Sequence, residues 1–316
     1  MNYSINPKEA YLLEQFSSLT FFETMRNNHR LFLDSLEELF EIYMHNLPYN
    51  LRDLPLPEQA DIQWGGTVLP NFRRTMDYID QCYAKIKAGD FTYLDCVGDV
   101  NSDSKGYKEF SPHWMDNLPY DKVKQCWKYH ELAEDYAFII GNTYPTYWDK
   151  GFLDKEFPHL ELFHNINIKL PESYPIYRAN SDIRIKSGEK VFKTGIYVCN
   201  ENNIGLAFIA SSREVEDAVA PEYTRQNPET GENMYFETTW ILVERIADEG
   251  GSAETFQIEN LKGFGGEICP HSGHWWSPAN QSEKRYFEQG EVFPEISNNA
   301  WGKTIWYLEV TNQIKD

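Results

Sequence analysis

Apolar side chains recur every three or four residues in the first half of the chain, as they do on one face of an amphipathic helix. This spacing predicts helices over residues 7–46, 69–89 and 119–140. Asn27-Asn28 is expected to interrupt the first run, so we predict about four main helices in this half.

Glycine and polar clusters separate these helical runs. Trp64-Gly65-Gly66 is expected to form a turn, and residues 90–118 a loop, because glycine, asparagine and serine favour turns over regular elements. Cys82 and Cys126 lie on or beside apolar helical faces, so we predict that both are small buried side chains without a chemical role.

The pattern changes after about residue 165. Short runs of β-branched and aromatic residues alternate with turn clusters, which is typical of strands and hairpins. The predicted fold class is therefore α+β, with a helical N-terminal half followed by a mostly antiparallel, β-rich C-terminal half. We expect two domains, a helical one over residues 1–165 and a β-rich one over residues 166–316.

A weak internal echo occurs within the β-rich half. Lys193-Thr-Gly-Ile-Tyr197 and His271-Ser-Gly-His-Trp275 both contain a hydroxyl residue, a glycine and then an aromatic residue two positions later. Two copies of a small β unit would explain the echo, and so would chance. The sequence leaves both open.

The 316-residue chain has 49 acidic and 29 basic side chains, a net charge of −20. This charge repels phosphate backbones and anionic lipids, so it argues against direct binding to nucleic acid or a membrane surface. It would instead attract a basic protein partner. Solubility alone is the simpler explanation for an acidic chain.

The predicted location is the cytoplasm. The first residues lack the basic and apolar regions of a secretory signal, and no stretch is apolar enough to span a membrane. The five cysteines are odd in number and widely spaced, so a disulfide framework is not expected.

Cys269, His271 and His274 are the most suggestive set of metal-ligand residues. They lack the usual paired spacing of a zinc site, so we predict neither a metal nor another cofactor. Ser272 lies outside the strand–turn–helix context of a hydrolase nucleophile, so we predict no catalytic residue.

A long acidic segment, residues 212–232, connects two predicted strands. Long loops on a rigid sheet often bind partners, whereas the alternative is a solvated hairpin extension. Its carboxylates are our candidates for partner binding: Glu214, Glu216, Asp217, Glu222, Glu229 and Glu232.

Glycine, proline and tryptophan are densest near the C-terminus, in Cys269-Pro-His-Ser-Gly-His-Trp-Trp-Ser-Pro278, Arg285-Tyr-Phe-Glu-Gln-Gly-Glu-Val-Phe-Pro294 and Gly302-Lys-Thr-Ile-Trp-Tyr307. This stretch resembles the C-terminal signature of immunity proteins of bacterial polymorphic toxin systems, family seventy-two and its sibling seventy-one. The similarity covers about the last fifty residues. Two features depart from the pattern, the histidines at 271 and 274 and the ending Trp306-Tyr-Leu308. The matching positions are Cys269, Pro270, Ser272, Gly273, Trp275, Pro278, Ala279, Ser282, Tyr286, Phe287, Gly290, Glu291, Pro294, Gly302, Thr304, Ile305 and Trp306.

The resemblance implies a non-enzymatic protein that binds a cognate secreted toxin domain and blocks it, as in interbacterial competition through type VI secretion. Glycines, prolines and tryptophans suit tight turns and core filling, so we expect the signature residues to be structural. Two other classes stay open. One is a metal- or carboxylate-dependent enzyme that reverses a toxin's modification, and the other a scaffold that self-associates, for example as a homodimer.

Overall fold

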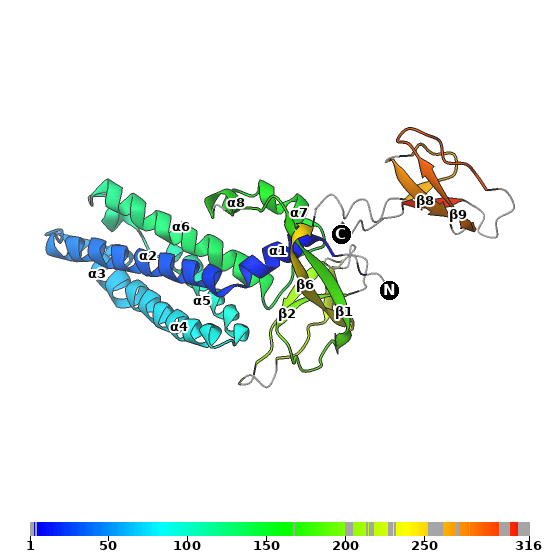
Figure 1. The fold of residues 1–316 in the computed structure, drawn as a ribbon. Coiled ribbons are helices and arrows are strands. Elements are labelled where there is room, and N and C mark those ends of the chain that lie inside the picture. The colour runs from blue at the N-terminus through cyan, green and yellow to red at the C-terminus, as the bar shows by residue number, and fades with distance from the viewer. Residues whose placement is uncertain are drawn as a thin grey trace. The chain divides into compact units, whose positions relative to one another are not determined.

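Helices occupy the N-terminal half of the computed structural model and antiparallel sheets the C-terminal half, which confirms the predicted α+β class (Figure 1). Contacts group the chain into two compact units, chiefly Lys8–Pro171 with Tyr177–Ile246, and Glu172–Ile176 with Ala247–Asp316. The structure describes all residues except 1, 2, 4, 167, 200–204, 213, 215–217, 227–229, 231, 252–261, 270–271, 278, 297–303 and 309–316.

The predicted helical break at Asn27-Asn28 is wrong. The chain breaks earlier, between α1 (Pro7–Phe16) and α2 (Leu19–His45), where the Ser18 hydroxyl caps α2 by accepting the backbone N–H of Phe21 at 3.2 Å. Asn28 is accommodated inside α2 because its side-chain amide donates to the carbonyl of Thr24, one turn earlier.

The predicted turn at Trp64-Gly65-Gly66 is also wrong. Helix α3 (Ala60–Gln63), a π-helical turn η3 (Trp64–Val68) and α4 (Leu69–Lys87) follow one another without a break. A β-carbon on Gly65 would lie 2.9 Å from the Phe40 ring, so this glycine serves close helix packing rather than a turn.

Residues 90–118 form helical turns rather than the predicted loop. They comprise η4 (Phe91–Cys96), α5 (Val97–Gly106), η5 (Tyr107–Glu109) and η6 (His113–Met115). The buried face of α5 contains Ser104, whose hydroxyl lies 3.1 Å from Nε2 of His130. A polar residue on the inner face hid the helical period.

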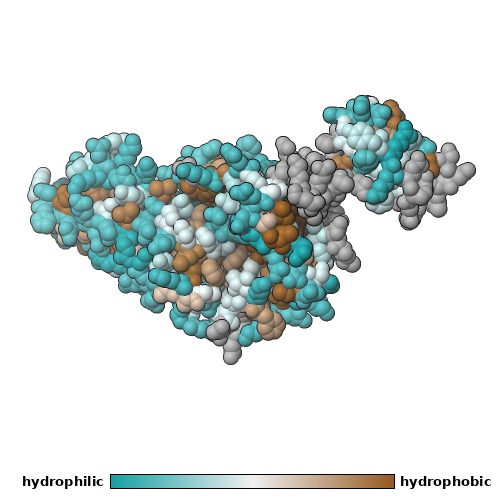
Figure 2. All heavy atoms as spheres, in the orientation of Figure 1, coloured by the Kyte–Doolittle hydropathy of each residue, from teal (hydrophilic) through white to brown (hydrophobic). Residues whose placement is uncertain are grey.

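Helices α2, α4 and α6 (Tyr120–Thr143) enclose the main core, where Phe32 meets Phe72 edge-to-face at 5.0 Å. Hydrophilic residues cover most of the visible outer face of α2 and α6 (Figure 2). Cys82 and Cys126 are fully buried in this core, as predicted. Two short turns, η1 (Leu51–Asp53) and η2 (Leu56–Glu58), lie between α2 and α3. After α6 the chain continues through α7 (Phe152–Lys155), η7 (Phe157–His159) and α8 (Glu161–Asn165).

The first sheet has the strand order β1-β6-β2-β3, from β1 (Tyr174–Lys186), β6 (Thr239–Gly251), β2 (Gly195–Val198) and β3 (Leu206–Ile209). Phe208 of β3 belongs to the helical core and contacts Phe91 and Tyr144. This sheet and the helices thus share one compact unit, whereas we predicted a division at 165/166. The two domains over residues 1–165 and 166–316 stay a prediction.

The second sheet has the order β7-β10-β8-β9, from β7 (Lys262–Phe264), β10 (Ile305–Leu308), β8 (Gly273–Ser277) and β9 (Asn280–Phe287). Its core consists of Cys269, Trp275, Phe287, Phe293, Trp306 and Leu308.

The two sheets are copies of one arrangement, which we call the first β module (residues 183–243) and the second β module (residues 262–308). In each, the last strand lies between the first and the second, and the third strand forms the far edge. Gly195 pairs with Ile209 at the start of β2 as Gly273 pairs with Phe287 at the start of β8. A β-carbon on Gly195 or Gly273 would meet Leu242 or Leu308 respectively, at 2.9 and 2.6 Å.

Hydrogen bonds repeat between the modules as well. Gly188, with φ +79°, donates to the Ala220 carbonyl, and Gly266, with φ +85°, donates to the Phe293 carbonyl. The hydroxyls of Thr194 and Ser272 each accept a backbone N–H from the residue that follows the third strand by two, at 2.9 and 2.8 Å. The sequence echo therefore marks a structural repeat rather than a chance match.

Candidate functional site

The connection between β3 and β6 contains the predicted acidic segment, and a hairpin projects from it. Strands β4 (Tyr223–Gln226) and β5 (Asn233–Phe236) pair antiparallel. The corresponding connection in the second module, from Pro294 to Thr304, is shorter than that from Pro221 to Thr238. The hairpin is thus an addition to the repeated β arrangement.

Exposed aromatic and acidic side chains lie on this hairpin. Tyr235 is 63% exposed, and Phe236 is 42% exposed although its ring lies 5.7 Å from that of Tyr223. Glu222 and Glu232, just before β4 and β5, are exposed as well. The predicted binding residues Glu216, Asp217 and Glu229 lie outside the described residues.

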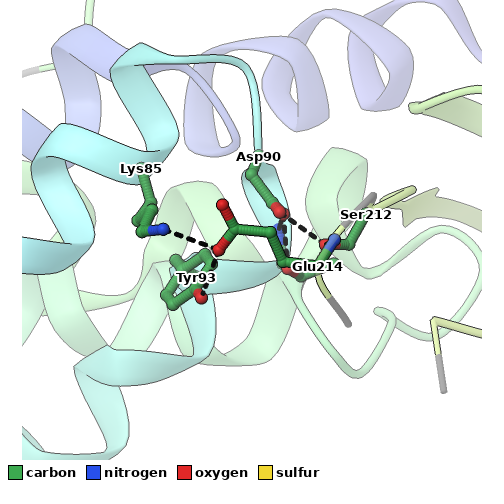
Figure 3. Close-up of polar contacts among 6 residues, drawn as sticks. Lys85, Asp90, Tyr93, Ser212 and Glu214 are labelled. Carbon is green, nitrogen blue, oxygen red and sulfur yellow. Dashed lines mark hydrogen bonds and ion pairs between the residues drawn. The ribbon is translucent and has the colours of Figure 1, made fainter. Parts of the chain in front are cut away.

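The start of the segment is tied to the helices (Figure 3). Glu214 forms an ion pair with Lys85 at the end of α4, Oε2 to Nζ 2.6 Å, and also accepts a 3.3 Å hydrogen bond from the Tyr93 hydroxyl. The Ser212 hydroxyl donates to Asp90 at 2.5 Å and accepts the backbone N–H of Glu214 at 3.1 Å.

This geometry shifts the electrostatics of Glu214. The hydrogen bond from Lys85 lowers the pKa of Glu214, and the same contact raises the pKa of Lys85, because each charge stabilises the other. Glu214 therefore anchors the segment to the helices, while Glu222 and Glu232 are its described carboxylates nearest the hairpin. No pattern in the sequence indicated Lys85, Asp90 and Tyr93, which come from a helix and a turn far away along the chain.

Most described signature residues are buried or hold turns in the second module. Cys269, Trp275 and Trp306 lie in its core, and Gly290 adopts φ +98°. Pro294 contributes its carbonyl, which accepts the Trp306 indole N–H at 3.0 Å. Tyr286 differs, since it is 52% exposed. Pro270, Pro278 and Gly302 lie outside the described residues.

In the described part of the chain, the metal-ligand residue types noted in the sequence, Cys269 and His274, do not form a common site. Cys269 belongs to the module core, whereas His274 is exposed and lies against Tyr286 with ring centroids 5.2 Å apart. His271 is not among the described residues, and within them no group of three or more His, Cys, Asp or Glu side chains is placed to hold a metal. Ser272 uses its hydroxyl to accept the N–H of Gln289.

A surface hollow of about 680 Å³ lies elsewhere, beside α4 and α5. None of the predicted site residues lines it. Its lining side chains are Arg74, Thr75, Asp77, Tyr78, Gln81 and Asp99.

Comparison with known proteins adds no relative to this picture. No protein-family model, curated protein or solved structure matches the chain. Within the described residues, no helix combines the length and apolar character needed to cross a membrane. The resemblance to immunity proteins stays a prediction, based on the signature residues alone.

Proposed function

We propose that the chain is an immunity protein, a non-catalytic inhibitor that binds and neutralises a cognate secreted bacterial toxin domain in the cytoplasm. The hairpin β4–β5 is the observation on which this proposal chiefly depends. It is absent from the corresponding connection of the second module as far as that connection is described. Tyr223 of β4 packs against the module core, whereas Tyr235 and Phe236 of β5 add an exposed aromatic surface to the module.

The chemistry of the hairpin suits a basic protein partner. Tyr235 and Phe236 offer aromatic area that is already ordered by strand pairing, and aromatic side chains dominate the energy of many interfaces. Glu222 and Glu232 supply nearby negative charge, and the −20 charge of the chain would speed the approach of a basic toxin.

The direct test uses the toxin gene that neighbours this one. Expressing the toxin in a susceptible strain should stop growth, and co-expressing this chain should restore it. Failure to restore growth, with both proteins present in soluble form, would contradict the proposal.

A second test asks whether the hairpin makes the contact. Tyr235→Ala combined with Glu232→Lys should weaken binding to the purified toxin domain by at least about tenfold, since truncation of a central interface aromatic typically has that effect. Glu232→Lys alone should flatten the salt dependence of binding. Glu41→Lys, on the exposed face of α2, is the matched charge control. Equal affinities in all three variants would exclude the hairpin but not the inhibitor function.

A further inference from the structure

One face of the second module's sheet is rich in exposed aromatic side chains. Trp276 of β8 stacks on its cross-strand neighbour Tyr307 of β10, with ring centroids 5.2 Å apart and planes at 28°. His274 of β8 meets its cross-strand neighbour Tyr286 of β9 edge-to-face, with ring centroids 5.2 Å apart. We call this the aromatic face; its described side chains are those of Phe264, His274, Trp276, Lys284, Tyr286, Ile305 and Tyr307.

The opposite face of the same sheet is filled by the module's own core. Trp275, Phe287 and Trp306 alternate with the aromatic-face residues along their strands and are nearly inaccessible. Trp276 and Tyr286, in contrast, are 39% and 52% exposed. Exposure of this much aromatic area on a module of this size is typical of an interaction surface.

In the first module, the equivalent face of the sheet is buried. By the matched registers, Val198, Phe208 and Ile241 stand where the second module has Trp276, Tyr286 and Tyr307. All three are buried, and Phe208 meets Phe91 of η4 and Tyr144 at the end of α6, at 6.1 and 6.2 Å. In the first module, therefore, helical elements of the chain cover this face at Phe208.

We propose that the aromatic face of the second module is a docking surface for a single amphipathic helix of a partner protein. This inference goes beyond the proposed function, since it concerns a different surface from the hairpin and holds whether or not the partner is a toxin.

The size of the face favours one helix over a second copy of the chain. The sheet of four short strands measures about 20 Å perpendicular to the strands and about 15 Å parallel to them, an area of roughly 300 Å². A stable dimer buries about 800 Å² on each partner. A helix of about 14 residues is about 20 Å long and 10 Å wide, so it matches the face. Two chains of net charge −20 would also repel each other.

The composition of the face indicates the kind of helix. Its described side chains are mostly aromatic or aliphatic. A helix that presents an apolar stripe to these rings, with polar side chains along its flanks, is complementary to this face.

The test measures binding of labelled helical peptides to the full chain by fluorescence anisotropy. The probe is an amphipathic helix of about 14 residues with a Leu and Phe stripe and Gln flanks. The control peptide scrambles the stripe at constant composition. The amphipathic probe should bind at least about tenfold more tightly than the scrambled control.

Trp276→Ala with Tyr286→Ala should reduce binding of the probe by at least about tenfold, whereas Tyr235→Ala on the hairpin should leave it unchanged. Both altered positions are partly exposed, so the variant should fold, which near-ultraviolet circular dichroism checks. Equal binding by the double variant, or by the scrambled peptide, would overturn the proposal. So would tighter binding of single-stranded oligothymidylate at this face, or a dimer in light scattering that the double variant abolishes.

Discussion

Trp240 and Trp306 occupy the same position in the two β modules, and each donates its indole N–H to a proline carbonyl. Trp240 reaches Pro221 at 2.8 Å, and Trp306 reaches Pro294 at 3.0 Å. Both rings are buried at the centre of their module core. The repeat therefore preserves a core ring together with the hydrogen bond that its polar atom requires.

Removing this hydrogen bond should destabilise the second module. Trp306→Phe leaves the carbonyl of Pro294 without its indole donor and removes part of the ring, which should cost about 1–3 kcal/mol of unfolding free energy. Urea unfolding followed by near-ultraviolet circular dichroism measures the loss. Trp276→Phe, on the exposed aromatic face, is the matched control and should change stability by less than about 0.5 kcal/mol. Equal losses in both variants would show that the indole bond is unimportant.

At a second pair of core positions, the large and the small side chain are swapped between the modules. Gly263 and Phe293 in the second module stand where the first has Ile185 and Ala220. A β-carbon on Gly263 would lie 2.2 Å from Cε2 of Phe293, so the glycine makes room for the phenylalanine ring. The total core volume is thus kept while its distribution changes.

This exchange predicts a compensating pair of substitutions. Gly263→Ala alone should cost about 1–3 kcal/mol through overpacking, and Phe293→Ala alone about 3–5 kcal/mol through the cavity that it leaves. The double variant should be more stable than the sum of these losses predicts, by about 0.5–3 kcal/mol, because each change relieves the other. Urea unfolding of all four proteins completes the cycle. Strict additivity would contradict the proposed complementarity.

Hydrophobic spacing was enough to predict the element types, because most inner positions of the helices and strands are apolar. It failed where polar side chains are satisfied inside a helix, as at Asn28, or where one faces the core, as at Ser104. The repeat was faint in sequence because its conserved features are backbone bonds and a few glycines and tryptophans, while core partners such as Tyr197 and Trp275 differ.

The candidate site was predictable only in part. The segment 212–232 was correctly placed between two strands, but the ion pair of Glu214 with Lys85 joins residues on different elements far apart in sequence. No local pattern specifies such a contact. Exposure alternates along β8, and the aromatic face that this creates became meaningful only beside the buried face of the first module.

Glu9 should make the first unit less stable as the pH rises towards neutral. The side chain is 5% exposed, and burial raises its pKa from the ordinary value of 4.5 to about 7 although it accepts the backbone N–H of Gly151 at 2.8 Å. Between these two pH values the folded chain retains a proton that the unfolded chain has lost, so unfolding free energy falls as the pH increases.

Glu9→Gln should remove this dependence and leave the protein up to about 3 kcal/mol more stable than the parent above pH 7, with little difference at pH 4. Urea unfolding at intervals from pH 4 to pH 8 measures the two curves. Glu41→Gln, at an exposed position of α2, controls for the loss of one carboxylate. Parallel curves for the parent and Glu9→Gln would contradict the predicted burial of a protonated acid.

His29 should make the protein less stable as the pH falls from neutral into the acid range. Its ring is 1% exposed between Phe32 and Phe72, and neither ring nitrogen finds a hydrogen-bond partner among the described residues. Burial lowers its pKa from 6.5 to about 4, so between these values the unfolded chain binds a proton that the folded chain does not, and stability falls as the pH decreases.

His29→Leu, which keeps a similar volume, should stabilise the protein by about 2 kcal/mol at pH 5 relative to pH 7.5. The exposed His45→Gln is the control, and urea unfolding at both pH values gives the comparison. A gain that is the same at both pH values would mean that His29 can be protonated inside the fold.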